Sequence, residues 1–141
     1  MKKKDVVYNK FNGLCAYSGK PLTHDWQVDH MKSKIKHEFN SRINCSDINE
    51  LNARMKSVNH IDNLMPALRM VNHYKRGYDL EAFRTFMSTF HLRLSKLPKK
   101  TKIESTKKRI SYMNKIAEIF DITPDKPFSG IFYFENTLNV K

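Results

Sequence analysis

The chain of 141 residues has only two cysteines, four glycines and no long run of hydrophobic residues. Cys15 and Cys45 are too few for a disulfide framework or for a zinc site built from cysteine alone, so we expect reduced thiols. A mean hydropathy of −0.64, without any apolar stretch of bilayer length, excludes a membrane-spanning helix. The basic start MKKKDVVYNKF lacks the apolar core and cleavage site of a secretory signal. We therefore expect a cytoplasmic protein without a membrane partner.

Acidic residues are also few. Fourteen Asp and Glu stand against 26 Lys and Arg, which gives a formal net charge of +12 at pH 7. Such an excess of positive charge is typical of proteins that bind a polyanion, and nucleic acid is the leading candidate. A basic surface that is merely solvated is the alternative, because composition alone does not identify a site.

The length predicts a single domain covering residues 1–141, and the patterns along the chain predict an α+β fold. Residues 11–22 combine apolar residues with Asn-Gly and Ser-Gly turn signals, and WQVDH at 26–30 then alternates apolar and polar residues. Both features predict short strands joined by tight turns. Residues 31–61 are predicted to form a polar connection containing a helix within SDINELNARMKS, capped by Ser46 or Asp47.

The second half of the chain is predicted to be mainly helical. LRMVNHYKRG indicates a short helix closed by Gly77. Hydrophobic residues at helical spacing after Asp79 predict an amphipathic helix that ends before Pro98. A second helix is predicted by the apolar residues between Ile110 and Phe120, and the β-forming tail SGIFYFEN predicts a terminal strand.

The dipeptide Asp29–His30, at the end of the predicted strand, combines two chemically useful groups. Histidine is suited to act as a general base near neutral pH, and a carboxylate is a natural ligand for a hard cation such as Mg²⁺. Adjacent residues of a strand point to opposite faces, so one group could bind a metal while the other faces a water. Such dipeptides also occur by chance on protein surfaces.

Three further residues, later in the sequence, extend this possible site. Asn63 lies in a predicted turn, and Asn72 and Lys75 are three residues apart and share a helix face. The amide oxygen of Asn72 could join Asp29 around a cation. The ammonium group of Lys75 could approach a phosphate oxygen.

The ordered combination CAYSGKPL, WQVDH, IDNLMPALRMVNHYK and LEAFR resembles the HNH endonuclease family over residues 11–84. The resemblance implies a ββα-metal core, followed here by a basic helical extension over residues 85–141. It also implies that Mg²⁺ or Mn²⁺ is the cofactor and that DNA is the substrate.

The resemblance assigns a role to each motif residue. His30 matches the general base and Asp29 matches a metal ligand. Asn72 matches the second metal ligand. Asn63 matches the residue that braces the loop and orients the base, and Lys75 matches a basic position close to the scissile phosphate.

The sequence departs from the family pattern at the structural zinc. Many members have two Cys-x-x-Cys pairs, and the corresponding positions here are Cys15 with Ser18 and Leu68 with Val71. One thiolate cannot hold a tetrahedral zinc. We therefore expect no structural zinc, and we expect Leu68 and Val71 to stabilise the region by packing against Leu14, Cys15 or Leu22.

Further candidates come from charge and residue type. The densest basic cluster begins at Arg93 and Lys96 and continues to Arg109, and Lys102 lies within it. The residues predicted to contact nucleic acid are Lys32, Lys34, Arg76, Lys99, Lys100, Lys107, Lys108 and Arg109. Isolated histidines, of which His73 is the strongest, are weaker ligand candidates, and the others are His37, His60 and His91. The aromatic residues that could stack on bases are Tyr17, Trp26 and Tyr74, although core packing is the expected role of Trp26.

The motifs favour a divalent-metal-dependent DNA endonuclease. Two alternatives remain: a non-catalytic DNA-binding module with the same fold, and a nuclease or binding protein directed at RNA. The presence of Asp29, His30, Asn63 and Asn72 together argues against the non-catalytic alternative.

Overall fold

The computed structural model describes residues 2–32 and 48–138 and has a mixed α+β fold. The predicted caps Ser46 and Asp47 lie outside the described residues. Within the described residues, no helix is long and apolar enough to cross a membrane. The helices are α1 (Lys3–Asn9), α3 (Ile48–Val58), α4 (Arg69–Lys75), α5 (Leu80–Ser88), α6 (Phe90–Ser95), α7 (Glu104–Phe120) and α8 (Tyr133–Leu138); the strands are β1 (Gln27–His30) and β2 (Leu64–Ala67), and a short 3-10 helix covers Ile61–Asn63.

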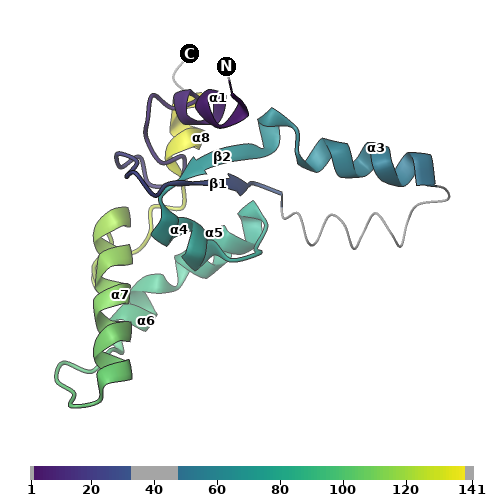
Figure 1. Cartoon of the computed structure of the whole chain (residues 1–141). Coiled ribbons are helices and arrows are strands. Elements are labelled where there is room, and N and C mark those ends of the chain that lie inside the picture. The colour runs from purple at the N-terminus through teal and green to yellow at the C-terminus, as the bar shows by residue number, and fades with distance from the viewer. Residues whose placement is uncertain (1, 33–47, 139–141) are drawn as a thin grey trace.

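The two strands form an antiparallel pair at the centre of the molecule (Figure 1). Gln27 lies opposite Ala67, and His30 lies opposite Leu64. The predicted strand at WQVDH is confirmed. All four residues of β2 are buried. Helix α1 contacts β2, and helix α4 contacts β1. The predicted helix before β2 is also confirmed as α3, which extends away from the rest of the molecule in Figure 1.

Residues 11–22 form turns rather than the predicted strands, with one isolated bridge between Leu14 and Pro21. The turn residues dominate this segment, since Asn12, Gly13 and Gly19 all have positive φ angles. At Gly19, a Cβ atom would also lie 2.7 Å from the ring of Tyr133. The segment is therefore too tightly turned to form extended strands.

The helix predicted between Asp79 and Pro98 is divided into α5 and α6 at Thr89, which has φ −106° and ψ 5°. The helix predicted after Ile110 is confirmed as α7 and begins earlier, at Glu104. The residue with a positive φ that ends α4 is Arg76, with φ 56° and ψ −141°, whereas the sequence predicted that Gly77 closes this helix.

The predicted terminal strand is wrong, because Tyr133–Leu138 is the helix α8. Glu135 explains the difference: its Oε1 accepts a hydrogen bond of 2.9 Å from the backbone N–H of Phe132. A Glu three residues into a helix that binds back to the residue before the helix is one half of a capping box. Arg84 also fixes the Glu135 carboxylate, with Arg84 Nη1 2.7 Å from Glu135 Oε1. These contacts outweigh the β propensity of the aromatic residues.

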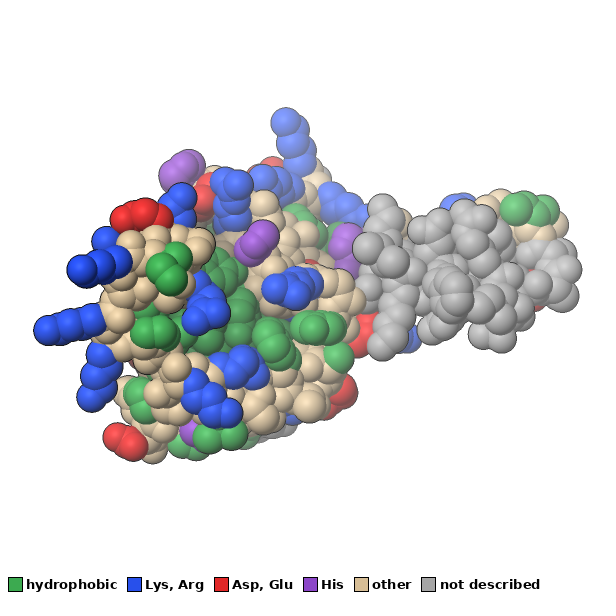
Figure 2. Space-filling view, turned by 90° about the horizontal axis from the view of Figure 1, so that it is seen from below, with side chains coloured by type: hydrophobic (Ala, Val, Ile, Leu, Met, Phe, Trp, Pro, Cys, Tyr) green, Lys and Arg blue, Asp and Glu red, His purple; other side chains and the backbone are tan. Residues whose placement is uncertain are grey.

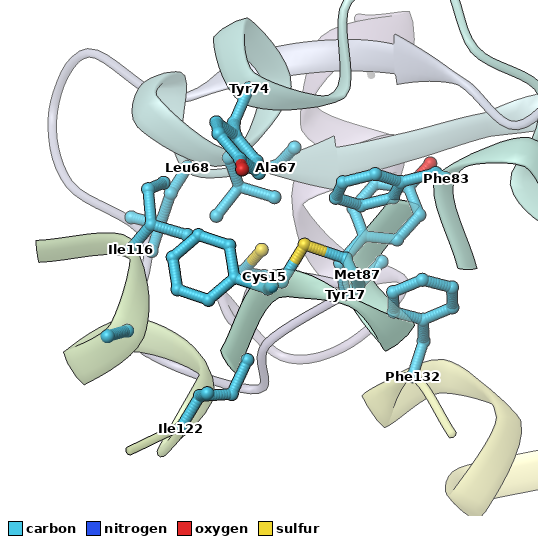
Figure 3. Close-up of a cluster of buried hydrophobic side chains, with 14 of the residues drawn as sticks. Cys15, Tyr17, Ala67, Leu68, Tyr74, Phe83, Met87, Ile116, Ile122 and Phe132 are labelled. Atoms are coloured by element: carbon cyan, nitrogen blue, oxygen red, sulfur yellow. The ribbon is translucent and has the colours of Figure 1, made fainter. Parts of the chain in front are cut away.

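One hydrophobic cluster joins the two halves of the chain (Figure 3). Cys15, Leu68 and Val71 belong to it, as the packing prediction required, and Leu22 packs against it. The ring of Phe132 stacks on Phe83 with centroids 5.3 Å apart. Residues beyond position 84 therefore complete the same core that residues 11–84 begin.

Candidate active site

Asp29 lies in a buried ionic contact between β1 and α4. Its Oδ2 atom is 3.0 Å from Lys75 Nζ and also accepts a hydrogen bond from the Tyr17 hydroxyl. Lys75 Nζ donates two further bonds, to the carbonyl oxygens of His30 at 3.0 Å and Tyr78 at 2.8 Å. Three acceptors satisfy the ammonium group, so the charge is fully paired inside the protein.

These three residues are almost inaccessible to solvent: 7% of the surface of Asp29 and 1% of that of Lys75 and of Tyr17 is exposed. Burial, followed by the charge of Asp29 and its hydrogen bond, raises the pKa of Tyr17 well above its usual value. Tyr17 therefore stays protonated and acts as a donor. In this geometry Lys75 cannot also contact a phosphate.

His30 is half-buried at the end of β1 and points to a different neighbour. Its Nε2 is 3.0 Å from Asn59 Oδ1, in the segment that connects α3 to the 3-10 helix. An amide oxygen only accepts, so this contact assigns the proton to Nε2 and the lone pair to Nδ1. The unprotonated Nδ1 is the ring atom that could accept a proton from water.

Asn63 immediately precedes β2 and braces the chain that follows His30. Its Oδ1 accepts from the backbone N–H of Lys32 at 2.7 Å, and its Nδ2 donates to the carbonyl of Lys32 at 3.2 Å. The backbone carbonyl of Asn63 accepts from Met31 N–H at 2.9 Å. The bracing role that the resemblance implies is chemically feasible in this geometry.

Asn72 and Lys75 both lie on the side of α4 that meets β1. Asn72 Nδ2 donates a hydrogen bond to Gln27 Oε1 at 2.7 Å. The amide oxygen of Asn72 is therefore the atom of this side chain that could coordinate a cation. The second oxygen of Asp29 is the corresponding carboxylate atom, since Oδ2 is held by Tyr17 and Lys75. Mg²⁺ often binds through one or two protein oxygens and completes its shell with water, so these two oxygens are the atoms that a metal-dependent mechanism would use.

A hollow of about 670 Å³ beside Asn63 has mixed charge. Lys32 is exposed at its edge, but carboxylates line it as well, from Asp62, Asp79 and Glu81. This hollow is therefore less suited to a phosphate than the sequence predicted for Lys32.

The remaining predicted nucleic-acid contacts fall on separate surfaces. Lys99, Lys100 and Lys107 line an open hollow on one side of α7, and Lys107 pairs with Glu104 at 3.2 Å. Arg109 lies on the opposite side of α7, in a cleft that also contains Arg76. Lys108 is exposed and lines neither hollow, and Lys34 lies outside the described residues.

The structure also shows the neighbours of the aromatic and histidine candidates from the sequence. Tyr17 and Tyr74 are buried, and Trp26 contacts Tyr8 at a centroid distance of 5.6 Å. His60 accepts a bond from the backbone of Asp62, His73 is exposed on α4, and His91 is half-buried; His37 and Cys45 lie outside the described residues. Among the described residues, no group of three or more His, Cys, Asp or Glu could hold a metal ion.

Sequence patterns did not identify the residues that hold the site together. Asn59 contacts His30, Gln27 contacts Asn72, and Tyr17 contacts Asp29. Lys10 binds the carbonyl oxygens of Ile61 and Leu64 at 3.0 and 2.7 Å and so attaches α1 to the start of β2. These contacts connect distant parts of the chain, so no local spacing reveals them.

Comparison of the chain with protein-family models, with curated proteins and with solved structures finds no match.

Proposed function

We propose that the protein is a divalent-metal-dependent DNA endonuclease that resembles the HNH family. The observation that carries the proposal is the convergence of Asp29, His30, Asn63 and Asn72 on the small β1–β2–α4 unit. The Asp29–His30 dipeptide, Asn63 and Asn72 come from three separate segments of the sequence. Each of the four has the chemistry that phosphodiester hydrolysis requires: a metal ligand, a general base, a brace for the base and a second metal ligand.

In the proposed reaction, Nδ1 of His30 accepts a proton from water while the water oxygen attacks the phosphorus atom. The bond from phosphorus to the 3′ oxygen breaks, and the 3′ oxygen leaves as a hydroxyl after protonation by solvent. Asn59 fixes the ring tautomer through Nε2. A bound Mg²⁺ or Mn²⁺ would stabilise the negative charge that develops in the transition state, and Asp29 and Asn72 are the residues that would hold it.

Lys75 has a positioning role in this proposal. Its ammonium group binds both the Asp29 carboxylate and the backbone carbonyl of His30, so it fixes the two adjacent residues relative to each other. Because Lys75 is 1% exposed, the phosphate-contacting role expected from the resemblance does not suit it.

Cleavage of supercoiled plasmid in Mg²⁺, Mn²⁺ or EDTA tests the proposal. We expect His30→Ala to reduce the rate by roughly 10² to 10⁴ while DNA binding is retained, since only the general base is lost. His24→Ala is the matched control, because His24 is exposed and lies in the loop before β1. Wild-type cleavage by His30→Ala would reject the assignment of the base.

Asn72→Ala is the cleaner test of metal binding, because Asp29→Ala would also leave Lys75 without its buried partner. We expect Asn72→Ala to lose Mg²⁺-dependent cleavage and Asn72→Asp, which keeps an oxygen donor, to retain part of it. Parallel assays with labelled RNA separate the DNA endonuclease from an RNA-directed enzyme. Binding without cleavage of either nucleic acid would support the non-catalytic module instead.

A further inference from the structure

A second site lies on the opposite side of α4 from Asp29. We define the α4–α7 cleft as the hollow of about 470 Å³ lined by His73, Tyr74, Arg76, Phe86, Arg93, Lys96, Leu97, Arg109, Tyr112 and Met113. Asn72 and Lys75 face β1, whereas His73 and Arg76, one position further along in each case, line this cleft. The same short helix therefore borders both sites.

The charge of the cleft has one sign. Four cationic side chains line it, and none of its lining residues is acidic. Arg76 and Arg109 are exposed, so they are available to a ligand, as is Lys96. A hollow bordered by cations alone concentrates anions.

Arg93 supplies a fixed charge at the base of the cleft. Its Nη2 donates to the carbonyl of Phe86 at 2.8 Å and to the Tyr74 hydroxyl at 3.2 Å, and its Nη1 donates to Thr89 Oγ1 at 2.6 Å. None of these acceptors is a carboxylate, so the positive charge is not neutralised. Arg93 Nε is also buried without a hydrogen-bond partner among the described residues.

Aromatic rings form the rest of the cleft. Tyr74 stacks on Phe86 with centroids 5.0 Å apart and an interplanar angle of 27°, and Tyr112 lies 6.0 Å from Tyr74. Tyr112 also meets the exposed ring of His73 at 6.1 Å. Burial raises the pKa of both tyrosines, so neither adds a negative charge.

Figure 2 shows the corresponding pattern on the lower face of the molecule, where blue Lys and Arg side chains surround a hollow of green hydrophobic side chains. Cations around an aromatic surface are the combination by which proteins bind a flexible nucleic-acid strand, with phosphates on the rim and a base stacked on a ring. A volume of about 470 Å³ lies in the range of small-ligand sites. A duplex could reach only the rim.

We propose that the α4–α7 cleft binds an unpaired nucleotide of a DNA strand, with the base against Tyr112 and the neighbouring phosphates on Arg76, Lys96 and Arg109. The inference deepens the proposed nuclease function and rests on it for the choice of DNA. It places a single-stranded or locally opened segment beside α4, while Asp29 and His30 lie on the other side of that helix.

Fluorescence anisotropy with labelled 12-nucleotide DNA tests the proposal in EDTA, where no metal-dependent cleavage occurs. Three probes are compared: a single strand, the matching duplex and a strand of abasic sites. We expect Tyr112→Ala to weaken single-strand binding by about 5- to 100-fold, the effect of losing one stacked base. Binding of the duplex and of the abasic strand should change by less than about twofold. The readout is therefore the ratio of single-strand affinity to duplex affinity.

Matched variants separate stacking from charge and from folding. Tyr8→Ala removes an aromatic residue on α1 and should leave the single-strand to duplex ratio unchanged. Tyr112→Phe keeps the ring and should retain the ratio, and thermal unfolding checks that Tyr112→Ala folds. Arg109→Gln should weaken the single strand more than Lys99→Gln does, because Lys99 lies on the opposite side of α7.

Single-strand affinity that is unchanged in a folded Tyr112→Ala, or an equal loss for single strand and duplex, would overturn the proposal. Arg76→Gln provides a second test if Tyr112→Ala does not fold: it should weaken binding of the single strand, and an unchanged single-strand affinity would again reject the site. Binding measured in EDTA does not depend on His30. A failed nuclease assignment and a failed cleft assignment are therefore distinguishable.

Discussion

Lys75 Nζ lies 3.0 Å from Asp29 Oδ2, between side chains that are 1% and 8% exposed. The contact links α4 to β1 at the point where the candidate catalytic residues begin. Breaking one partner of such a pair leaves an unpaired buried charge, which typically lowers the free energy of unfolding by about 3 to 5 kcal/mol.

Lys75→Met should therefore be strongly destabilising in urea unfolding. Lys20→Met is the control, because the Lys20–Asp121 pair is 42% and 66% exposed and should contribute less than about 1 kcal/mol. The double variant Asp29→Asn/Lys75→Met should recover part of the loss, since no buried charge remains. A fully stable Lys75→Met would show that the pair does not maintain the β1–α4 contact.

Glu135→Gln should reduce stability at neutral pH by roughly 1 kcal/mol, after allowance for partial exposure of the Arg84 contact. The hydrogen bond from Arg84 lowers the pKa of Glu135 below its ordinary value of 4.5. Stability from a carboxylate with a lowered pKa is present above pH 4.5 and disappears as the pH falls through the folded value. The wild-type and variant unfolding curves should therefore converge in acid, whereas Glu104→Gln, at an exposed pair, should differ little from wild type at any pH.

The packing of Cys15, Leu68 and Val71 in one cluster leads to a prediction about zinc. Protein purified without added metal should contain well under one zinc per chain, and its melting temperature should not change with a strong chelator. Leu68→Ala should cost about 2 to 5 kcal/mol, because packing would supply the stability. Stoichiometric zinc, together with a large chelator-induced fall in melting temperature, would mean that a metal site stabilises the fold.

Four lysines of the basic cluster before and at the start of α7 are predicted to contact phosphates without reading sequence. Their replacement by Gln should flatten the dependence of log K on log salt by about 0.9 for each lost contact, equally for DNA of any sequence. The variant replaces Lys99, Lys100, Lys107 and Lys108. Replacement of Lys2, Lys4, Lys20 and Lys126 by Gln removes the same four charges elsewhere and controls for the net charge. An unchanged slope in the first variant would show that its lysines are only solvated.

Elements with a strong local pattern were predictable from the sequence. The alternation in WQVDH predicted β1, and the spacing of apolar residues up to Phe120 predicted α7. By contrast, α1 has only one buried residue, Val7, and therefore no hydrophobic periodicity to detect. The division at Thr89 has neither a glycine nor a proline to signal it.

The places of the candidate residues in the fold were more predictable than their contacts. Asp29 and His30 end β1, Asn63 immediately precedes β2, and Asn72 lies on α4. The burial of Lys75, however, depends on Tyr17 and Asp29 arriving from other parts of the chain. A sequence pattern gives the charge of such a lysine but not its neighbours, so it favoured a phosphate contact over an internal one.

The aromatic packing around Tyr17 also has a consequence for the order of events during synthesis. The Tyr17 hydroxyl holds Asp29, and its ring lies against Phe132 and Phe134 with centroids 5.5 and 6.2 Å away. A nascent chain from which residue 134 has not yet emerged would therefore leave that ring uncovered and Asp29 poorly held. The buried contact of Asp29 with Tyr17 would therefore be completed only after α8 has been synthesised.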